Sequence, residues 1–353
     1  MSAISRNTFW RRCITPRPPS TAIILPWCST ICTGTVSYTH LIMAKYTGTR
    51  EAFAVALTEM AREDKRFMFV SPDSLKAMRA TGFADEFPER YVEVGIAEQD
   101  AVDVASGLST CGLIPYVATY AGFLTMRACE QMRTFVAYPN LNVKFVGING
   151  GLIGGEREGV THQFFEDLGI LSSMPNFTIF TPADAEQTYE AVKEAAKIDG
   201  PVYIRAGSGR EKDIYEEGTP FNMDGVTVLK NYGTDAVIFA SGFILDRVLK
   251  AADLLEKEGI HVTVGDVNIL HGKNNEKFLE LMASTKQVFT VEDHNINGGL
   301  GSYICSLACE NQPVAVKRIG LTTFGESGPA DELADHYGYS PEGIAKTVKE
   351  TLK

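Results

Sequence analysis

The chain has little positive charge for its length and no long hydrophobic run. Its 353 residues carry 33 Lys and Arg against 44 Asp and Glu, which gives a formal net charge of −11 at pH 7. A nucleic-acid-binding surface needs a basic face, so this balance argues against nucleic acid as a partner. After residue 43 no apolar run approaches the roughly 20 residues of a membrane-spanning helix, and we expect no membrane insertion.

Cysteine pairs with the spacing of metal or redox sites are also missing. Seven cysteines occur, and none stands in a C-x-x-C arrangement. Four of them lie beyond the first 32 residues, and their surroundings predict buried free thiols: Cys111, Cys129, Cys305 and Cys309. Free thiols fit a reducing compartment, so we expect a cytoplasmic protein.

The first 42 residues differ in composition from the rest. They combine Arg11-Arg12, a proline-rich piece and a short apolar patch that ends at Pro26. A secretory signal needs a longer apolar core and a small-residue cleavage site, and neither is clear here. We therefore expect residues 1–42 to be a disordered or non-native extension, with the native chain beginning at Met43.

From residue 43 onward, short apolar strands alternate with helical patterns. This order predicts an α/β protein with two successive domains, each with a mainly parallel sheet covered by helices. The domains are expected at 43–210 and 235–353, joined by a polar linker at 211–234 that contains an edge hairpin. Thr49 and Asp184 stand directly before helical patterns and are expected to cap those helices.

One carboxylate stands where a strand turns into a helix. The strand-like run Tyr91–Val94 leads into Gly95, and a helical pattern begins near Glu98. Such a turn lies at the edge of a sheet, beside backbone N–H groups that favour a negative charge. On this pattern alone, Glu98 is either an ordinary first-turn residue or a functional acid.

Four short motifs occur in order along the chain: Gly95–Gln99, Thr161–Glu166, Glu292–Ser302 and Phe324–Gly328. They read G-I-A-E-Q, T-H-Q-F-F-E, E-D-H-N-I-N-G-G-L-G-S and F-G-E-S-G. In sequence and in order they resemble signatures of the transketolase and 1-deoxyxylulose-5-phosphate synthase family. The resemblance runs from about residue 49 to the C-terminus.

The family's G-D-G motif, which is followed by an Asn and holds Mg²⁺ and the diphosphate of thiamine diphosphate, is absent. The one Gly-Asp pair, Gly265-Asp266, is followed by Val267. The chain therefore resembles a transketolase pyrimidine-binding domain plus C-terminal domain. This implies thiamine diphosphate shared with a partner subunit that carries the G-D-G…N motif and holds Mg²⁺, in an α₂β₂ assembly.

The resemblance gives Glu98 a catalytic and cofactor-binding role. In this family the cofactor's aminopyrimidine removes the thiazolium proton, and a carboxyl group exchanges a proton with the far nitrogen of that ring. The carboxyl must be sheltered, because burial favours its neutral, donating form. We expect the apolar neighbours Val94, Ile96 and Ala97 to shelter it.

The segment Tyr120–Leu124 resembles the family segment in which an aromatic ring stacks on the pyrimidine. Phe123 is the first candidate for this cofactor contact and Tyr120 the second, although Phe123 could equally be an ordinary core residue. Four polar residues further on are expected to contact the partner subunit or to form a solvated face: Arg127, Glu130, Gln131 and Arg133.

Three residues are implied to bind a sugar phosphate substrate. His162 could hydrogen-bond substrate hydroxyls or pass protons, with a structural histidine as the alternative. Glu158 stands where transketolases often carry an aspartate that contacts a sugar hydroxyl. Arg205 matches an arginine that binds a substrate phosphate, with a salt bridge as the alternative, and Arg210 is a looser candidate.

Some positions depart from the family pattern or stay open. Transketolases usually have a second histidine where this chain has Asn149 and its glycine neighbours, and Asp100 stands where some relatives have histidine. These changes leave the donor and acceptor sugars open. The helix that follows His294 and Gly298 could accept an anion at its N-terminus, or its glycines could serve close packing against the partner.

These features predict the C-terminal subunit of a split transketolase. It would transfer a two-carbon ketol unit between phosphorylated or otherwise anionic sugars, and only with its partner subunit. Three alternatives remain: a subunit of the 1-deoxyxylulose-5-phosphate synthase type, the β-subunit of a 2-oxo-acid dehydrogenase, and a non-catalytic regulatory subunit. The dehydrogenase subunits lack the T-H-Q-x-x-E motif.

Overall fold

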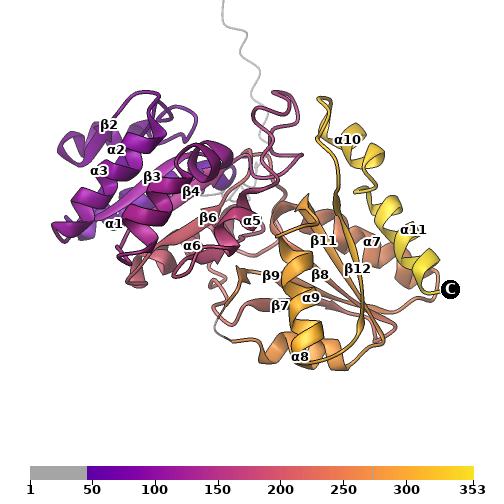
Figure 1. Cartoon of the computed structure of the whole chain (residues 1–353). Helices are drawn as coiled ribbons and strands as arrows, with labels where there is room; N and C mark the ends of the chain where they lie inside the picture. Colours follow the sequence, from indigo (N-terminus) through magenta and orange to yellow (C-terminus); the bar gives the residue numbers. More distant parts are fainter. Residues whose placement is uncertain (1–45, 273) are drawn as a thin grey trace, which may run out of the picture. The chain divides into compact units, whose positions relative to one another are not determined.

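Apolar strand segments gather into two sheets, as the alternating pattern predicts. The computed structural model describes residues 46–272 and 274–353 (Figure 1). The expectation for residues 1–42 lies outside this range. Both sheets are mainly parallel and carry helices on their faces, so the predicted α/β class is confirmed.

The first sheet has seven strands in the order β10-β5-β6-β4-β3-β1-β2, all parallel except β10. Its strands are β1 (Phe67–Ser71), β2 (Tyr91–Glu93), β3 (Ile114–Tyr120), β4 (Lys144–Ile148), β5 (Thr178–Phe180), β6 (Val202–Arg205) and β10 (Ile269–Leu270). Strands β1, β4 and β6 are buried throughout, because helices cover both faces.

Helices lie on both faces of this sheet. One face carries α1 (Thr49–Glu63) and α6 (Ala185–Lys197), which pack on Phe69 and Tyr116. The other face carries α3 (Glu98–Thr110) and the segment 123–137, which pack on Val70 and Val117. Neighbouring strand residues thus point to opposite cores. Two short helices complete this part: α2 (Thr81–Glu86) and α5 (Asp167–Ser172).

The second sheet has five strands in the order β12-β11-β8-β9-β7, with β7 antiparallel at one edge. Its strands are β7 (Val226–Asn231), β8 (Ala236–Ser241), β9 (Val262–Val267), β11 (Gln287–Asn295) and β12 (Ala315–Leu321). Strand β7 lies inside the stretch that the sequence assigns to the linker, where an edge hairpin was expected. Its antiparallel partner is β9, from the second domain.

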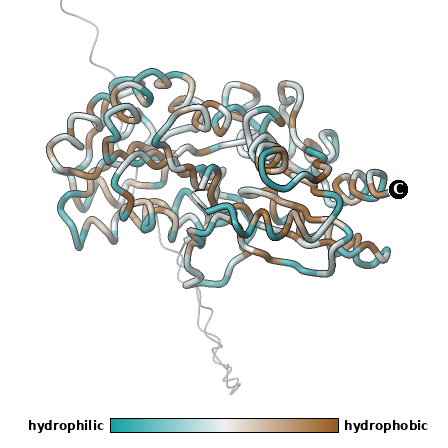
Figure 2. The backbone as a smooth tube through the Cα atoms, turned by 60° about the horizontal axis from the view of Figure 1, so that its bottom comes forward, coloured by the Kyte–Doolittle hydropathy of each residue, from teal (hydrophilic) through white to brown (hydrophobic). Residues whose placement is uncertain are grey.

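Helices also cover the second sheet on both faces. Helices α7 (Leu245–Lys257) and α11 (Pro341–Thr351) pack on one core, and α8 (Glu276–Ala283) and α9 (Leu300–Glu310) pack on the other. A short helix, α10 (Ala330–His336), precedes α11. In Figure 2 the hydrophobic stretches run mostly along central segments, and hydrophilic stretches mostly along peripheral helices and loops.

The two predicted helix caps have different outcomes. The Asp184 side chain accepts a hydrogen bond from the Gln187 N–H at 2.9 Å, which confirms it as the N-cap of α6. Thr49 is already inside α1, whose N-cap is Gly48, so that prediction is wrong. The Thr49 hydroxyl instead donates to Glu211 at 3.1 Å and ties the helix start to a distant loop.

The segment after β3 is not a regular α-helix. Wider π-type turns cover Phe123–Arg127 and Met132–Ala137, with a short α-helical turn, α4 (Cys129–Gln131), between them. Such turns are rare and often occur at functional sites. Here the first turn brings Arg127 over the ring of Phe123.

Two simpler expectations can also be compared with the structure. The four cysteines in the described ranges are free thiols, but Cys111 and Cys309 are exposed and Cys129 and Cys305 are only partly buried, so the predicted burial was wrong. Within residues 46–272 and 274–353, no helix has the length and apolar character needed to cross a membrane.

Candidate active site

The predicted site residues follow or end parallel strands of the first sheet. Glu98 comes after β2, Phe123 after β3 and His162 in the long loop after β4, while Arg205 ends β6. The carboxyl ends of parallel strands meet at one edge of a sheet, where α/β proteins usually bind ligands. The topology therefore brings together residues that are far apart in sequence.

Glu98 is the first residue of α3, and its carboxyl group is buried. Gly95, with φ of +72°, makes the left-handed turn between strand and helix, and its N–H donates to Glu93 at 2.9 Å. Glu98 is 3% exposed, so the expected shelter exists. Ile96 is 76% exposed, however, so it was wrongly predicted to provide that shelter.

Arg127 is the charged partner of Glu98. Its Nη1 donates to Glu98 Oε1 at 2.6 Å, and its Cζ lies 4.1 Å from the centroid of the Phe123 ring. The guanidinium thus contacts a buried carboxylate and an aromatic face at the same time. The Arg127 side chain is 48% exposed, so one side of this arrangement borders solvent.

Four rings cluster beside this pair. The Phe123 centroid lies 5.3 Å from those of Tyr120 and His162 and 5.4 Å from that of Phe164. The rings of Tyr120 and His162 meet edge to face at 5.0 Å. The structure therefore brings Phe123, Tyr120 and His162 together, as a site shared by these residues requires.

A mostly apolar pocket of about 650 Å³ opens beside the ring cluster. It is lined by Gly122, Phe123, Met126, Arg127, Val160, Thr161, His162, Gln163, Phe164, Glu166 and Phe324. Exposed hydrophobic side chains at the pocket are those of Met126, Val160 and Phe324. Exposed apolar groups around a concave site are typical of a surface that another molecule covers.

The loop that carries His162 is held by the second half of the chain. The His162 ring is half-buried, with Nδ1 3.0 Å from the Thr161 hydroxyl. The next residue, Gln163, is buried and donates through Nε2 to the Glu326 carbonyl at 2.8 Å. The T-H-Q and F-G-E-S-G motifs are therefore in direct contact, and the second motif positions the first.

The two glutamates of this loop differ in their surroundings. Glu158 is exposed, whereas Glu156 is buried and forms an ion pair with Arg210 Nη1 at 2.6 Å. Burial raises the pKa of Glu156 above its usual range. Arg210, the looser phosphate candidate, is therefore already paired. Asn149 is also buried, and its Oδ1 accepts from Arg50.

Arg205 does not face the pocket. Its side chain is 2% exposed and bonds Asp167 twice, at 2.9 and 3.1 Å, in a bidentate pair. Burial is the largest influence on Asp167 and opposes its ionisation, but the charge of Arg205 and the other groups that face or bond to this carboxyl together outweigh it and hold its pKa below the usual range. The geometry contradicts the predicted phosphate contact and supports the alternative, a salt bridge.

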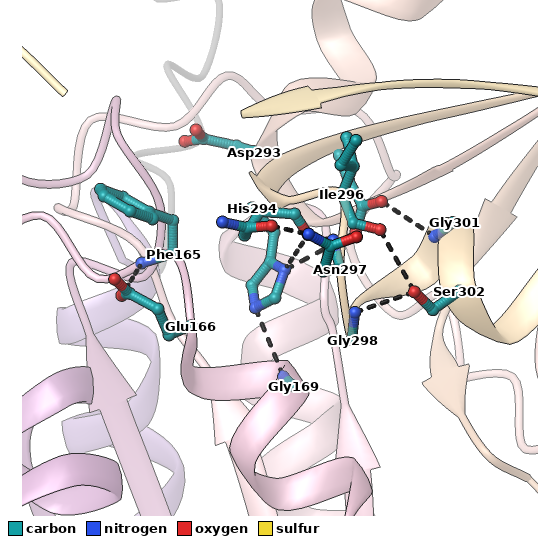
Figure 3. A network of polar contacts seen from close by, with 12 residues as sticks. Phe165, Glu166, Gly169, Asp293, His294, Ile296, Asn297, Gly298, Gly301 and Ser302 are labelled. Atoms are coloured by element: carbon teal, nitrogen blue, oxygen red, sulfur yellow. Dashed lines mark hydrogen bonds and ion pairs between the residues drawn. The ribbon is translucent and has the colours of Figure 1, made fainter. Parts of the chain in front are cut away.

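The Arg205 pair is part of a polar junction between the two halves of the chain, which belong to one compact unit. Arg205 also donates to the Asp293 carbonyl at 3.0 Å. Beside it, His294 Nε2 accepts from the Gly169 N–H at 3.4 Å and Nδ1 donates to the Asn295 carbonyl at 2.7 Å (Figure 3). Burial lowers the pKa of His294 to about 4, so the imidazole is neutral.

The N-terminus of α9 is occupied by the chain itself, so the predicted anion site is absent there. Glu292 Oε1 accepts from the Gly301 N–H at 2.9 Å, and burial raises the pKa of Glu292 to about 8. Gly298 packs on Gly169, where an added Cβ would come within 2.7 Å of the Gly169 Cα. The close packing is therefore within the chain.

The site contains residues that the sequence did not assign. Phe164 and Glu166 line the pocket, and burial raises the pKa of Glu166 above its usual range. Both lie inside the T-H-Q-F-F-E motif, so motif membership was the available signal. Arg127 was expected at a partner surface or on a solvated face, because its contacts with Glu98 and Phe123 depend on the turn after β3.

Two family models match the chain. The transketolase pyrimidine-binding domain matches residues 45–209, and the transketolase C-terminal domain matches residues 225–344. The two matches cover most of the described residues and leave residues 210–224 between them.

Two relatives and one solved structure match this chain along nearly their own whole length. A subunit of the apulose-4-phosphate transketolase of Phocaeicola vulgatus is 35% identical over 306 residues, which cover 86% of this chain and 97% of that protein. The 6-deoxy-6-sulfo-D-fructose transketolase subunit of a Clostridium species is 33% identical, over 86% of this chain and 94% of that protein. A solved structure described as a split gene transketolase, inactive beta4 tetramer, is 37% identical with a TM-score of 0.78, over 86% of this chain and 98% of that one.

Proposed function

The chain belongs to the transketolase family, and from this membership we propose that it is the C-terminal subunit of a split transketolase. In this proposal it transfers a two-carbon ketol unit between phosphorylated or otherwise anionic sugars. It acts with a partner subunit that carries the diphosphate-binding domain. Thiamine diphosphate is the shared cofactor, and Mg²⁺ is held by the partner.

The observation that carries the proposal is a buried carboxyl group beside an aromatic face. Glu98 is 3% exposed and starts a helix at the edge of the sheet, and the Phe123 ring is close enough for one guanidinium to contact both. A pyrimidine ring with a protonatable nitrogen needs these two groups: a sheltered acid and a flat apolar surface. The residues present therefore fit the cofactor's ring.

In this proposal, Glu98, Phe123 and Tyr120 each have a defined role toward the cofactor's ring. The Glu98 carboxyl holds and exchanges a proton at the ring nitrogen. Phe123 stacks on the ring, and Tyr120 supports Phe123 from 5.3 Å away. Thiamine diphosphate, when bound, supplies the chemistry of the ketol transfer itself. The apolar lining of the pocket excludes water from this chemistry.

His162 and Glu158 are the proposed substrate contacts on this chain. The His162 ring lies at the pocket wall, 5.3 Å from Phe123, and can donate to or accept from a sugar hydroxyl. Glu158 is exposed on the same loop, where its carboxylate is free to accept from a hydroxyl. Arg205 is left out because it is buried and paired with Asp167.

Three observations support the dependence on a partner. The chain has no G-D-G motif. The pocket is bordered by exposed apolar side chains, which a second subunit would cover. The solved relative is described as an inactive tetramer of β chains. An α₂β₂ assembly in the cytoplasm is the form we propose.

The test combines the full chain with a partner subunit that carries the diphosphate-binding domain. We expect the pair to convert a ketose phosphate and an aldose phosphate with thiamine diphosphate and Mg²⁺, and the chain alone to be inactive. In the pair, Glu98→Gln should lower kcat by about 10²- to 10⁴-fold because the acid–base contribution is lost. Activity would be measured by product formation with a panel of ketose phosphates.

The matched control is Glu89→Gln, which makes the same change at an exposed glutamate before β2 and should keep full activity. Near-normal turnover by Glu98→Gln in an intact assembly would refute the catalytic role. Product formed only from pyruvate and an aldose phosphate would favour the 1-deoxyxylulose-5-phosphate synthase alternative.

A further inference from the structure

We propose that Arg127 is a positioning residue that occupies the cofactor's ring site in the unloaded subunit and leaves it when the pyrimidine binds. The ring site is defined here by the Glu98 carboxyl and the Phe123 face. The inference rests on the proposed function, because it assumes that these two groups receive the pyrimidine.

The first observation is the contact with the acid. Arg127 Nη1 donates to Glu98 Oε1 at 2.6 Å, a short charge-assisted hydrogen bond to a buried carboxyl. The ring nitrogen of the cofactor would share a proton with the same carboxyl. The Arg127 guanidinium must therefore leave the Glu98 carboxyl when the ring nitrogen of the cofactor takes its place.

The second observation is the contact with the aromatic face. The Arg127 Cζ lies 4.1 Å from the centroid of Phe123, so the guanidinium lies over the ring. Guanidinium groups are planar and stack on aromatic faces much as a heteroaromatic ring does. A flat group that donates to Glu98 and covers Phe123 makes both contacts assigned to the pyrimidine, so the two cannot occupy the site together.

The third observation is that Arg127 is free to leave. Its side chain is 48% exposed and lines the open pocket of about 650 Å³. It ends the π-type turn Phe123–Arg127, and the next residue, Ala128, departs from helical geometry with φ of −105° and ψ of 22°. Rotation of the Arg127 side chain into solvent needs no rearrangement of the buried core.

A physical reason for this arrangement is the cost of a buried charge. A buried carboxylate without a hydrogen-bond donor is destabilising, and Glu98 must be buried to serve as an acid. Arg127 gives this carboxyl a donor until the cofactor brings its own. The same contact keeps Glu98 and Phe123 oriented toward one planar ligand.

The test measures the affinity of the assembled pair for thiamine diphosphate, in the presence of Mg²⁺, by isothermal titration calorimetry. Arg127→Met keeps an unbranched apolar stem but removes the competing guanidinium, so the dissociation constant should fall by about 3- to 30-fold. Arg127→Lys keeps the charge without the flat face, and its gain should be smaller. Arg66→Met, at an exposed arginine that pairs with Asp64 before β1, is the matched control and should leave the affinity unchanged.

A crystal structure of the thiamine diphosphate-loaded pair gives a second readout that does not depend on assembly of a variant. It should have the Arg127 guanidinium away from both Glu98 and Phe123. Equal or weaker binding by Arg127→Met, or a loaded structure with Arg127 still on both groups, would overturn the inference. If the wild-type pair binds no thiamine diphosphate, the proposed function fails and this inference fails with it.

Discussion

Two arginine–carboxylate pairs in this chain have the same chemistry and different surroundings. Arg205 bonds Asp167 at 2.9 Å in the junction between the two halves, and Arg127 bonds Glu98 at 2.6 Å at the edge of the first sheet. Both carboxyl groups are buried. The difference lies in the arginines, because Arg205 is 2% exposed and Arg127 is 48% exposed.

The remaining contacts of each pair explain what it can do. Arg205 also donates to the carbonyls of Phe164 and Asp293, and Asp167 accepts from the Tyr203 hydroxyl at 2.7 Å. Displacing Arg205 would break several buried hydrogen bonds at once. Arg127 instead lies on an aromatic face beside an open pocket, where another planar group can take its place. An ion pair is structural or exchangeable according to these other contacts.

The largest expected effect is on the stability of the junction. Arg205→Met should lower the free energy of unfolding by about 3–5 kcal/mol, because Asp167 would remain buried without its counter-charge. Urea unfolding, followed by circular dichroism, measures this loss as a shift of the midpoint.

Arg127→Met is the control from the other pair. Glu98 would lose its charged donor, but the Arg127 side chain is half in solvent and gives up one hydrogen bond, so we expect a loss of about 1–3 kcal/mol, smaller than that of Arg205→Met. Equal losses of unfolding free energy in Arg205→Met and Arg127→Met would contradict the distinction between the two pairs, because both would then be structural.

The pH dependence of stability gives a further test at the buried junction between the two halves of the chain. Burial raises the pKa of Glu292 from its ordinary 4.5 to about 8. The folded chain therefore keeps a proton that the unfolded chain releases, and this contribution is present at low pH and is lost as the pH rises toward 8. Glu292→Gln should remove this fall, which amounts to about 1 kcal/mol per pH unit at most.

The measurement is the difference in free energy of unfolding between parent and Glu292→Gln from pH 6.5 to 8. Groups common to both chains cancel in this difference. His294, whose pKa is lowered to about 4, changes stability in the opposite sense, with its effect below its ordinary value of 6.5, outside this window. A difference that stays constant with pH would mean that Glu292 is ionised in the folded chain.

Sequence alone predicted the parts of the molecule that depend on local pattern. The turn at Gly95 and the helix from Glu98 follow from a strand-like run, a glycine and an apolar period, and Asp184 caps its helix as its position indicates. The two-sheet α/β fold follows from the same alternation. The four motifs also placed the family correctly.

The outcomes that differ from prediction depend on contacts between distant segments. Arg205 looked available for a phosphate because Asp167 and Asp293, which enclose it, come from other parts of the chain. Ile96 was expected to shelter Glu98 because it is an apolar neighbour in sequence. Its exposure of 76% depends on the packing of distant segments, which the local sequence does not reveal. The contact of Arg127 with Phe123 required the π-type turn, which has no clear sequence signature.

The smallest expected effect concerns the aromatic side of the ring site. Phe123→Leu keeps an apolar side chain but removes the flat face, so it should weaken thiamine diphosphate binding by the assembled pair about 2- to 13-fold. Phe221→Leu makes the same change at a buried aromatic that packs on Phe180 at 4.7 Å, and should not alter the affinity. Titration calorimetry on both pairs measures the two constants. Unchanged binding by Phe123→Leu would make Phe123 an ordinary core residue, and the contact of Arg127 with its ring would then say nothing about the cofactor.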